Sequence, residues 1–221
     1  KPIVKKNIDT KTYREVLYPY AVDHFYEKLG INIIFGTKVD EKATKIFLPF
    51  DLYENLKNTT YKNQPLVIES TTLFQANRQK PEFSFIDSIY SLIGILLLFI
   101  IFNTKRSNLV FFSILGLLGL FFISVGFYSF HKELVMNYNT LLFNPLYLLL
   151  IYFMKKNNTK WIKIIAVICL VFLGIYLILI SSKVYLIIVL PILLTSCILL
   201  VGVLNKNNLL SSKKQNGTNS F

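Results

Sequence analysis

Acidic residues are scarce in the second half of this chain. Residues 83–221 contain two acids, Asp87 and Glu133, against 11 lysines and arginines, whereas residues 1–82 contain 10 acids and 13 basic residues. Only 16% of the 221 residues are charged and 53% are hydrophobic, while soluble domains average about 25% charged residues. This composition excludes a wholly soluble domain, a disordered chain, a collagen and a DNA-binding module.

Cysteine and histidine are equally rare, with two of each. Cys169 and Cys197 lie in apolar runs without metal-ligand spacing, where a thiol behaves as a small hydrophobe. No Ser/His/Asp set, metal-ligand cluster or glycine-rich phosphate loop can be assembled from these residues. We therefore expect no metal, no cofactor and no catalytic residue within these 221 residues.

Long hydrophobic runs are what the chain has instead. A bilayer core about 30 Å thick needs about 20 apolar residues in a helix. Five candidate spans lie at about 85–102, 109–130, 140–154, 164–180 and 184–204. The last two are separated only by Ser181-Ser182-Lys183 and must form a hairpin, because one helix over 164–204 would be about 60 Å long. The predicted fold is mainly α: a five-helix transmembrane bundle at 83–204.

The loops between these spans predict their orientation. Loops 103–108 and 155–163 and the tail after residue 204 carry nine basic residues on one face, against two on the other. Basic loops mark the cytoplasmic side. The sequence thus predicts a multi-pass membrane protein. Residues 205–221 form a cytoplasmic tail, and residues 1–82 lie outside the cytoplasm.

Residues 1–82 read as the C-terminal part of a larger α+β domain, and we expect the natural protein to extend before Lys1. Periodicity predicts helices near 9–29, 40–46 and 51–58 and a strand at 65–70, with a strand or a loop at 30–36. Ser84 and Asp87 have the spacing of a capping box for the first span.

A dense group of polar residues lies where the second and third spans meet the outer face. It consists of His131, Asn137, Asn139 and Asn144, the last followed by Pro145 within a predicted span. Asparagines often cap helix ends, so one interpretation is a kinked, interfacial helix start. The other is a polar pocket that binds substrate, because polar side chains at membrane depth need partners and are often functional.

The order and spacing of these residues resemble a known family. The pattern from His131 through Asn137-x-Asn139 to Asn144-Pro145-Leu146 is similar to the membrane half of the Lnb-type lipoprotein N-acyltransferases of Bacteroidota. Tyr13-Arg14-Glu15, Gly30-Ile31-Asn32 and Phe47-Leu48-Pro49 resemble the end of that family's periplasmic domain.

The resemblance implies an enzyme of the bacterial inner membrane that acylates the terminal, lipid-modified cysteine of a lipoprotein. It also implies that residues 1–82 are the C-terminal part of a periplasmic domain. The enzyme's cysteine nucleophile would lie before Lys1, and its partners would be a membrane lipid and a lipoprotein, with no nucleic acid. It also implies that His131, Asn137, Asn139 and Asn144 line a substrate pocket. The alternatives are a non-catalytic membrane anchor or interaction module and, third, a transporter. A transporter would need charged residues within the spans after Asp87, and the sequence has none.

Overall fold

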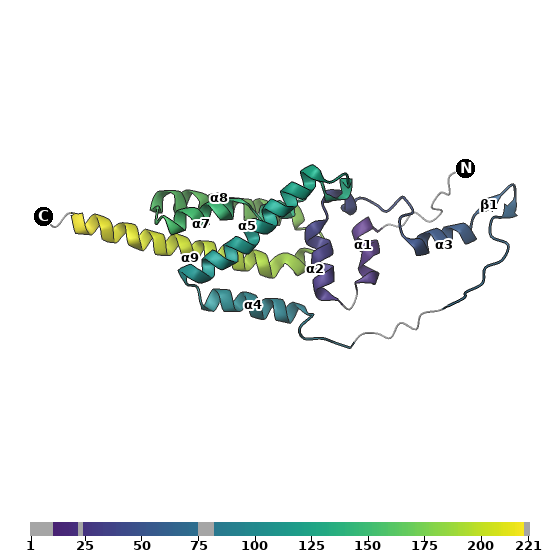
Figure 1. Ribbon diagram of the computed structural model, residues 1–221, viewed down its shortest axis with the longest axis horizontal. Helices are drawn as coiled ribbons and strands as arrows, with labels where there is room; N and C mark the ends of the chain where they lie inside the picture. Colours follow the sequence, from purple (N-terminus) through teal and green to yellow (C-terminus); the bar gives the residue numbers. More distant parts are fainter. Residues whose placement is uncertain (1–10, 22–23, 75–81, 219–221) are drawn as a thin grey trace. The chain divides into compact units, whose positions relative to one another are not determined.

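The computed structural model describes residues 11–21, 24–74 and 82–218. The chain forms two compact units. One consists of Lys1–Asp23 and Val39–Phe83, and the other of His24–Lys38 and Ser84–Phe221. The second unit thus combines a short N-terminal segment, 24–38, with all of the long apolar helices (Figure 1).

The first unit is built from short elements. Helix α1 (Tyr13–Leu17) begins with a capping box, in which Thr12 and Glu15 each bond the other's backbone N–H. It continues into the 3₁₀ helix η1 (Tyr18–Tyr20), which contains Pro19. The Arg14 Nε donates to Asp40 Oδ1 over 2.7 Å, and both side chains are buried. This ion pair joins α1 to the segment that follows residue 39.

Two predicted elements of this unit are wrong. The predicted helix at 40–46 is absent, because the 3₁₀ helix η2 (Thr37–Asp40) ends where Thr12 and Lys42 form a β-bridge. The predicted strand at 65–70 is a two-residue pairing of β1 (Thr60–Tyr61) with β2 (Gln64–Pro65). Helix α3 (Pro49–Lys57) is confirmed, although it begins at Pro49 instead of following an Asp51 cap.

The second unit contains helix α2 and a set of apolar helices. The prediction of a strand or a loop at 30–36 is wrong for residues 30–34, because helix α2 continues through them to Ile34. The elements are α2 (Phe25–Ile34), α4 (Ile89–Ile101), α5 (Lys105–Tyr128), η3 (Lys132–Leu134), α6 (Asn139–Leu142), α7 (Leu146–Lys155), α8 (Thr159–Ile180) and α9 (Leu186–Thr218).

Three helices are long and apolar enough to cross a membrane: Lys105–Tyr128, Thr159–Ile180 and Leu186–Asn207. They correspond to the predicted spans 109–130, 164–180 and 184–204, and they indicate membrane association. The turn between α8 and α9 confirms the predicted hairpin. Helix α9 continues to Thr218, so residues after 204 extend the helix (Figure 1).

The other two predicted spans are shorter than expected. Helix α4 has 13 residues, because its N-cap is Ser88 and not Ser84. The predicted span 140–154 is divided into α6 and α7, and Asn144-Pro145 lies between them. Proline cannot donate a backbone N–H to the preceding turn, so the helix restarts after Pro145.

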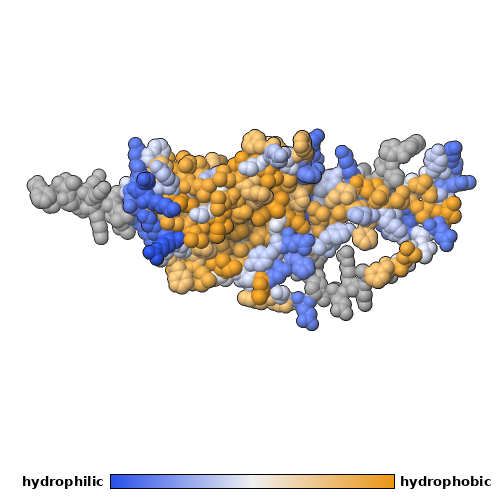
Figure 2. Space-filling view, viewed as in Figure 1, coloured by the Kyte–Doolittle hydropathy of each residue, from blue (hydrophilic) through white to orange (hydrophobic). Residues whose placement is uncertain are grey.

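Helix α8 packs against both α7 and α9, while α5 packs on α6 and α7 and α4 packs on α9. Bonds between helix ends show that successive helices run in alternate directions. At one end Lys105 bonds Asn157 and Asn207 bonds Thr159; at the other, Tyr176 bonds Asn139. Figure 2 shows a broad hydrophobic surface over these helices and hydrophilic residues at their end nearest the C-terminus.

Candidate functional site

The C-terminus of helix α2 is held by two asparagine side chains that follow it by about 100 residues, Asn137 in the loop before α6 and Asn139 at the start of α6. A helix leaves its last carbonyls without partners inside the helix. The Asn137 Nδ2 donates to the carbonyl oxygens of Ile33 (2.7 Å) and Ile34 (3.0 Å). The Asn139 Nδ2 donates to the carbonyl oxygens of Asn32 (2.8 Å) and Ile33 (3.2 Å). We call the side chains of Asn137, Asn139 and Tyr176 the asparagine latch.

Asn139 connects this latch to the membrane helices. Its Oδ1 accepts a 2.6 Å hydrogen bond from the hydroxyl of Tyr176 on α8. Its backbone N–H and its Nδ2 both donate to Asn137 Oδ1, over 2.9 and 2.8 Å. Asn139 is 1% exposed and Tyr176 is fully buried. Hydrogen bonds are strengthened in such surroundings, and losing one is costly. The latch is therefore a closed network of paired polar groups.

Backbone contacts extend the latch beyond the helix end. The N–H of Gly36 donates to the Glu133 carbonyl over 2.8 Å, and the N–H of Thr37 donates to the Met136 carbonyl over 3.3 Å. A Cβ on Gly36 would lie 2.2 Å from the Val135 carbonyl oxygen. The chain therefore needs glycine at this position.

The other two predicted site residues lie outside the latch. The Asn144 Oδ1 accepts from the Leu146 N–H over 2.9 Å, so this buried side chain caps the start of α7. His131 has an exposed side chain at the start of η3, and its backbone N–H donates to Ser129 Oγ. The structure therefore brings Asn137 and Asn139 together, while Asn144 serves the next helix and His131 lies at the surface.

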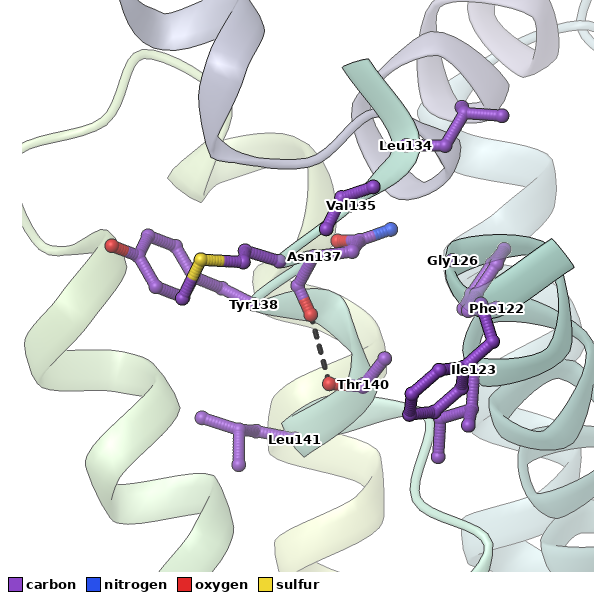
Figure 3. Close-up of a pocket in the computed structure, with 11 residues that line it drawn as sticks. Phe122, Ile123, Gly126, Leu134, Val135, Asn137, Tyr138, Thr140 and Leu141 are labelled. Atoms are coloured by element: carbon purple, nitrogen blue, oxygen red, sulfur yellow. Dashed lines mark hydrogen bonds between the residues drawn. The ribbon is translucent and has the colours of Figure 1, made fainter. Parts of the chain in front are cut away.

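An apolar pocket of about 530 Å³ lies beside the latch. It is lined by the end of α5, the loop before α6, and α6 itself: Phe122, Ile123, Gly126, Phe127, Leu134, Val135, Met136, Asn137, Tyr138, Thr140 and Leu141. Figure 3 shows Phe122 and Ile123 on one side and Leu141 on the other. The Thr140 hydroxyl donates to the Asn137 carbonyl over 2.8 Å. This α5–α6 pocket lies within the usual size range of ligand sites, about 300–1,000 Å³.

Sequence reasoning missed a second contact between α2 and the membrane helices. Asp87 lies just before α4, and its carboxylate accepts from the Tyr26 N–H (2.9 Å) and lies 3.1 Å from His24 Nδ1. The Tyr26 hydrogen bond and, less strongly, His24 hold the pKa of Asp87 below its ordinary value. Asp87 thus stabilises the first turn of α2, where a carboxylate complements the helix dipole.

The sequence-based prediction of the site did not include Tyr176. Its position could have indicated a role, because a tyrosine within an apolar helix usually finds a partner for its hydroxyl when it is buried.

Among the described residues, no group of three His, Cys, Asp or Glu side chains could hold a metal ion. Cys169 and Cys197 lie on α8 and α9, within the apolar helices.

No family model, no curated protein and no solved structure matches this chain.

Proposed function

We propose that this chain is the membrane half of an enzyme that N-acylates the terminal, lipid-modified cysteine of bacterial lipoproteins. In this proposal the nucleophilic cysteine belongs to residues that precede Lys1. The membrane helices then hold the lipid that supplies or receives the acyl chain. The observation that carries the proposal is the α5–α6 pocket beside the asparagine latch.

The position and lining of this pocket suit an acyl chain. Most of its lining residues are apolar, and the Thr140 hydroxyl donates to the protein's own backbone. An apolar ligand in the pocket therefore leaves the Thr140 hydroxyl paired. The latch ties α2 to the same loop that lines the pocket, so an extramembrane segment is anchored where the lipid would bind.

The proposal includes five spans, with α4 and the α6–α7 pair added to the three long helices. The basic end, with nine lysines and arginines against two, then faces the cytoplasm of an inner membrane, and residues 1–82 lie in the periplasm. Alkaline phosphatase fused after Asn216 should be inactive in this topology. High activity of that fusion would reverse the orientation of every helix.

A second candidate is a non-catalytic membrane anchor or interaction module. The observation that favours it is that the amide groups of Asn137 and Asn139 bind the protein's own backbone. In this alternative the asparagines stabilise α2 and the pocket has no catalytic role. Loss of activity in an asparagine variant would not separate the two candidates, because such variants also break the latch.

A pocket-filling substitution separates them. Gly126 lines the pocket, and a Cβ there would meet only the Leu134 carbonyl, at 3.7 Å. The test uses cells that express the protein from its complete natural gene. Gly126→Leu should lower lipoprotein N-acylation about 10²-fold there, because the added side chain displaces the acyl chain from its position for reaction. Gly174→Leu is the control, since a Cβ at Gly174 meets no atom within 4 Å.

Acylation is divided by the protein's abundance in membranes for each variant. Equal normalised acylation by both variants would remove the pocket from the reaction. Absence of acylation by the unsubstituted protein would favour the anchor.

A further inference from the structure

A second cleft lies at the opposite, basic end of the same helices. Its volume is about 180 Å³, and its lining comes from the ends of α5, α7, α8 and α9: Lys105, Asn108, Met154, Asn157, Ile162, Val203, Lys206 and Asn207. We call it the basic cleft. The membrane-half proposal does not use it, because the α5–α6 pocket and the latch lie at the other end of α5.

The two lysines of this cleft bond neutral acceptors. Lys105 Nζ donates to Asn157 Oδ1 over 2.8 Å, and Lys206 Nζ donates to the carbonyl and side-chain oxygens of Asn103. From residue 88 to the end, the sequence contains a single acid, Glu133, which lies in η3 beyond the other end of α5. Among the described residues, neither Lys105 nor Lys206 forms an ion pair with a carboxylate.

Two helix N-termini add to this positive field. Helix α5 begins at Lys105 behind its Thr104 cap, and α8 begins at Thr159 behind its Asn158 cap. The N-terminus of a helix carries a partial positive charge that favours anions. The cleft is thus suited to a phosphate group.

Asn108 indicates what accompanies that phosphate. This residue is 1% exposed, and its Nδ2 donates to Asn103 Oδ1 over 2.9 Å. Its Oδ1 is buried and has no hydrogen-bond partner among the described residues. Buried acceptors are almost always paired in folded proteins. The cleft thus offers cations for a phosphate and an acceptor for a hydroxyl or N–H donor.

We propose that the basic cleft binds the headgroup of an anionic phospholipid that carries hydroxyl groups, of the phosphatidylglycerol type. The phosphodiester lies between Lys105 and Lys206, and a headgroup hydroxyl donates to Asn108 Oδ1. Met154, Ile162 and Val203 supply an apolar side to the cleft, which favours a lipid over free phosphate. Basic pockets between membrane helices commonly bind such headgroups.

Native mass spectrometry of the full chain in detergent tests this, with lipids that share palmitoyl and oleoyl chains. Phosphatidylglycerol should bind about 100-fold more tightly than phosphatidylcholine, whose headgroup is neutral overall and lacks the hydroxyls. Inorganic phosphate alone should bind far more weakly than either. Equal binding of the two lipids would overturn the proposal, and tight binding of phosphate would show a free-anion site instead.

Two double variants of lysines test whether phosphatidylglycerol binds at the basic cleft or to any of the basic residues at that end of the helices. Lys105→Gln with Lys206→Gln should weaken phosphatidylglycerol binding about 30-fold. Lys160→Gln with Lys163→Gln removes the same charge from exposed residues outside the cleft lining, and it should change binding less than about threefold. Equal losses in the two variants would overturn the cleft as a site.

The hydroxyl contact is tested with phosphatidylmethanol, which has the same phosphodiester charge and lacks the hydroxyls. The unsubstituted chain should prefer phosphatidylglycerol about tenfold. Asn108→Leu should bind both lipids equally while keeping the lysine-dependent preference over phosphatidylcholine. Equal binding of the two anionic lipids by the unsubstituted chain would overturn the role of Asn108.

Discussion

The two ends of the membrane helices use asparagines in opposite ways. At the latch end, Asn137 and Asn139 bond the carbonyls of α2, each other and Tyr176. At the basic end, Asn108 is just as deeply buried, yet its Oδ1 has no partner among the described residues. A closed network favours stability, whereas an open acceptor beside lysines favours a ligand. Burial and residue type alone therefore do not distinguish a structural asparagine from a binding one.

The largest expected difference between the two ends is in the free energy of unfolding when the buried asparagine at each end is replaced by alanine. Asn139→Ala removes partners from the Asn32 and Ile33 carbonyls and from the Tyr176 hydroxyl, so we expect it to lower the free energy of unfolding by about 3 kcal/mol. Asn108→Ala removes a single bond to Asn103, and we expect a loss of about 1 kcal/mol. Thermal unfolding in detergent gives both values, and equal losses would contradict the comparison.

A backbone clash should break the latch from its other side. Gly36→Ala places a Cβ 2.2 Å from the Val135 carbonyl oxygen, and we expect it to cost about 2 kcal/mol as the loop moves. Gly30→Ala is the control in α2, because a Cβ there meets no atom within 4 Å. Hydrogen exchange of the Gly36 and Thr37 amides measures the opening. Equal protection in both variants would show that this contact is dispensable.

Tyr176→Phe sharpens the comparison within the latch. It removes the hydroxyl that donates to Asn139 Oδ1 and keeps the ring, so we expect a loss of about 1.5 kcal/mol. Combined with Asn139→Ala, it should cost less than the sum of the two single losses, because both remove the same bond. Additive losses in thermal unfolding would mean that the two side chains act independently.

The smallest expected effect concerns pH and the first turn of α2. The folded pKa of Asp87 lies below its ordinary value of 3.8, chiefly because of the Tyr26 N–H bond. Its carboxylate therefore stabilises the fold above pH 3.8, and this contribution is lost as the pH falls through the lowered pKa. Hydrogen exchange at Tyr26 should accelerate in that range. Asp87→Asn should remove this acceleration, and an unchanged profile would exclude Asp87 as its cause.

Much of the membrane unit could be predicted from local patterns. Runs of apolar residues predicted the three long helices, and the short Ser181-Ser182-Lys183 segment predicted the α8–α9 turn. Pro145 predicted a disturbed helix, and the chain does divide there into α6 and α7. These features follow from composition and backbone chemistry within a few residues, which is information that a single sequence contains.

The four candidate site residues show where such reasoning ends. The sequence placed His131, Asn137, Asn139 and Asn144 in one polar cluster, because they are close along the chain. In the structure only Asn137 and Asn139 share partners, and those partners are carbonyls about 100 residues earlier. Asn144 caps the helix next to it, and the side chain of His131 is exposed.

By itself, the sequence determined which segments are apolar, where proline and short polar turns interrupt them, and at which end the basic charge gathers. Only the tertiary structure decided that α2 extends to Ile34 and packs at the asparagine latch. It also decided that Asn108 Oδ1, which has no partner among the described residues, lies in the same cleft as Lys105 and Lys206. The physical reason is distance along the chain. Hydropathy and helix breaking act between near neighbours, whereas the pairing of a buried polar group depends on partners that folding brings from elsewhere.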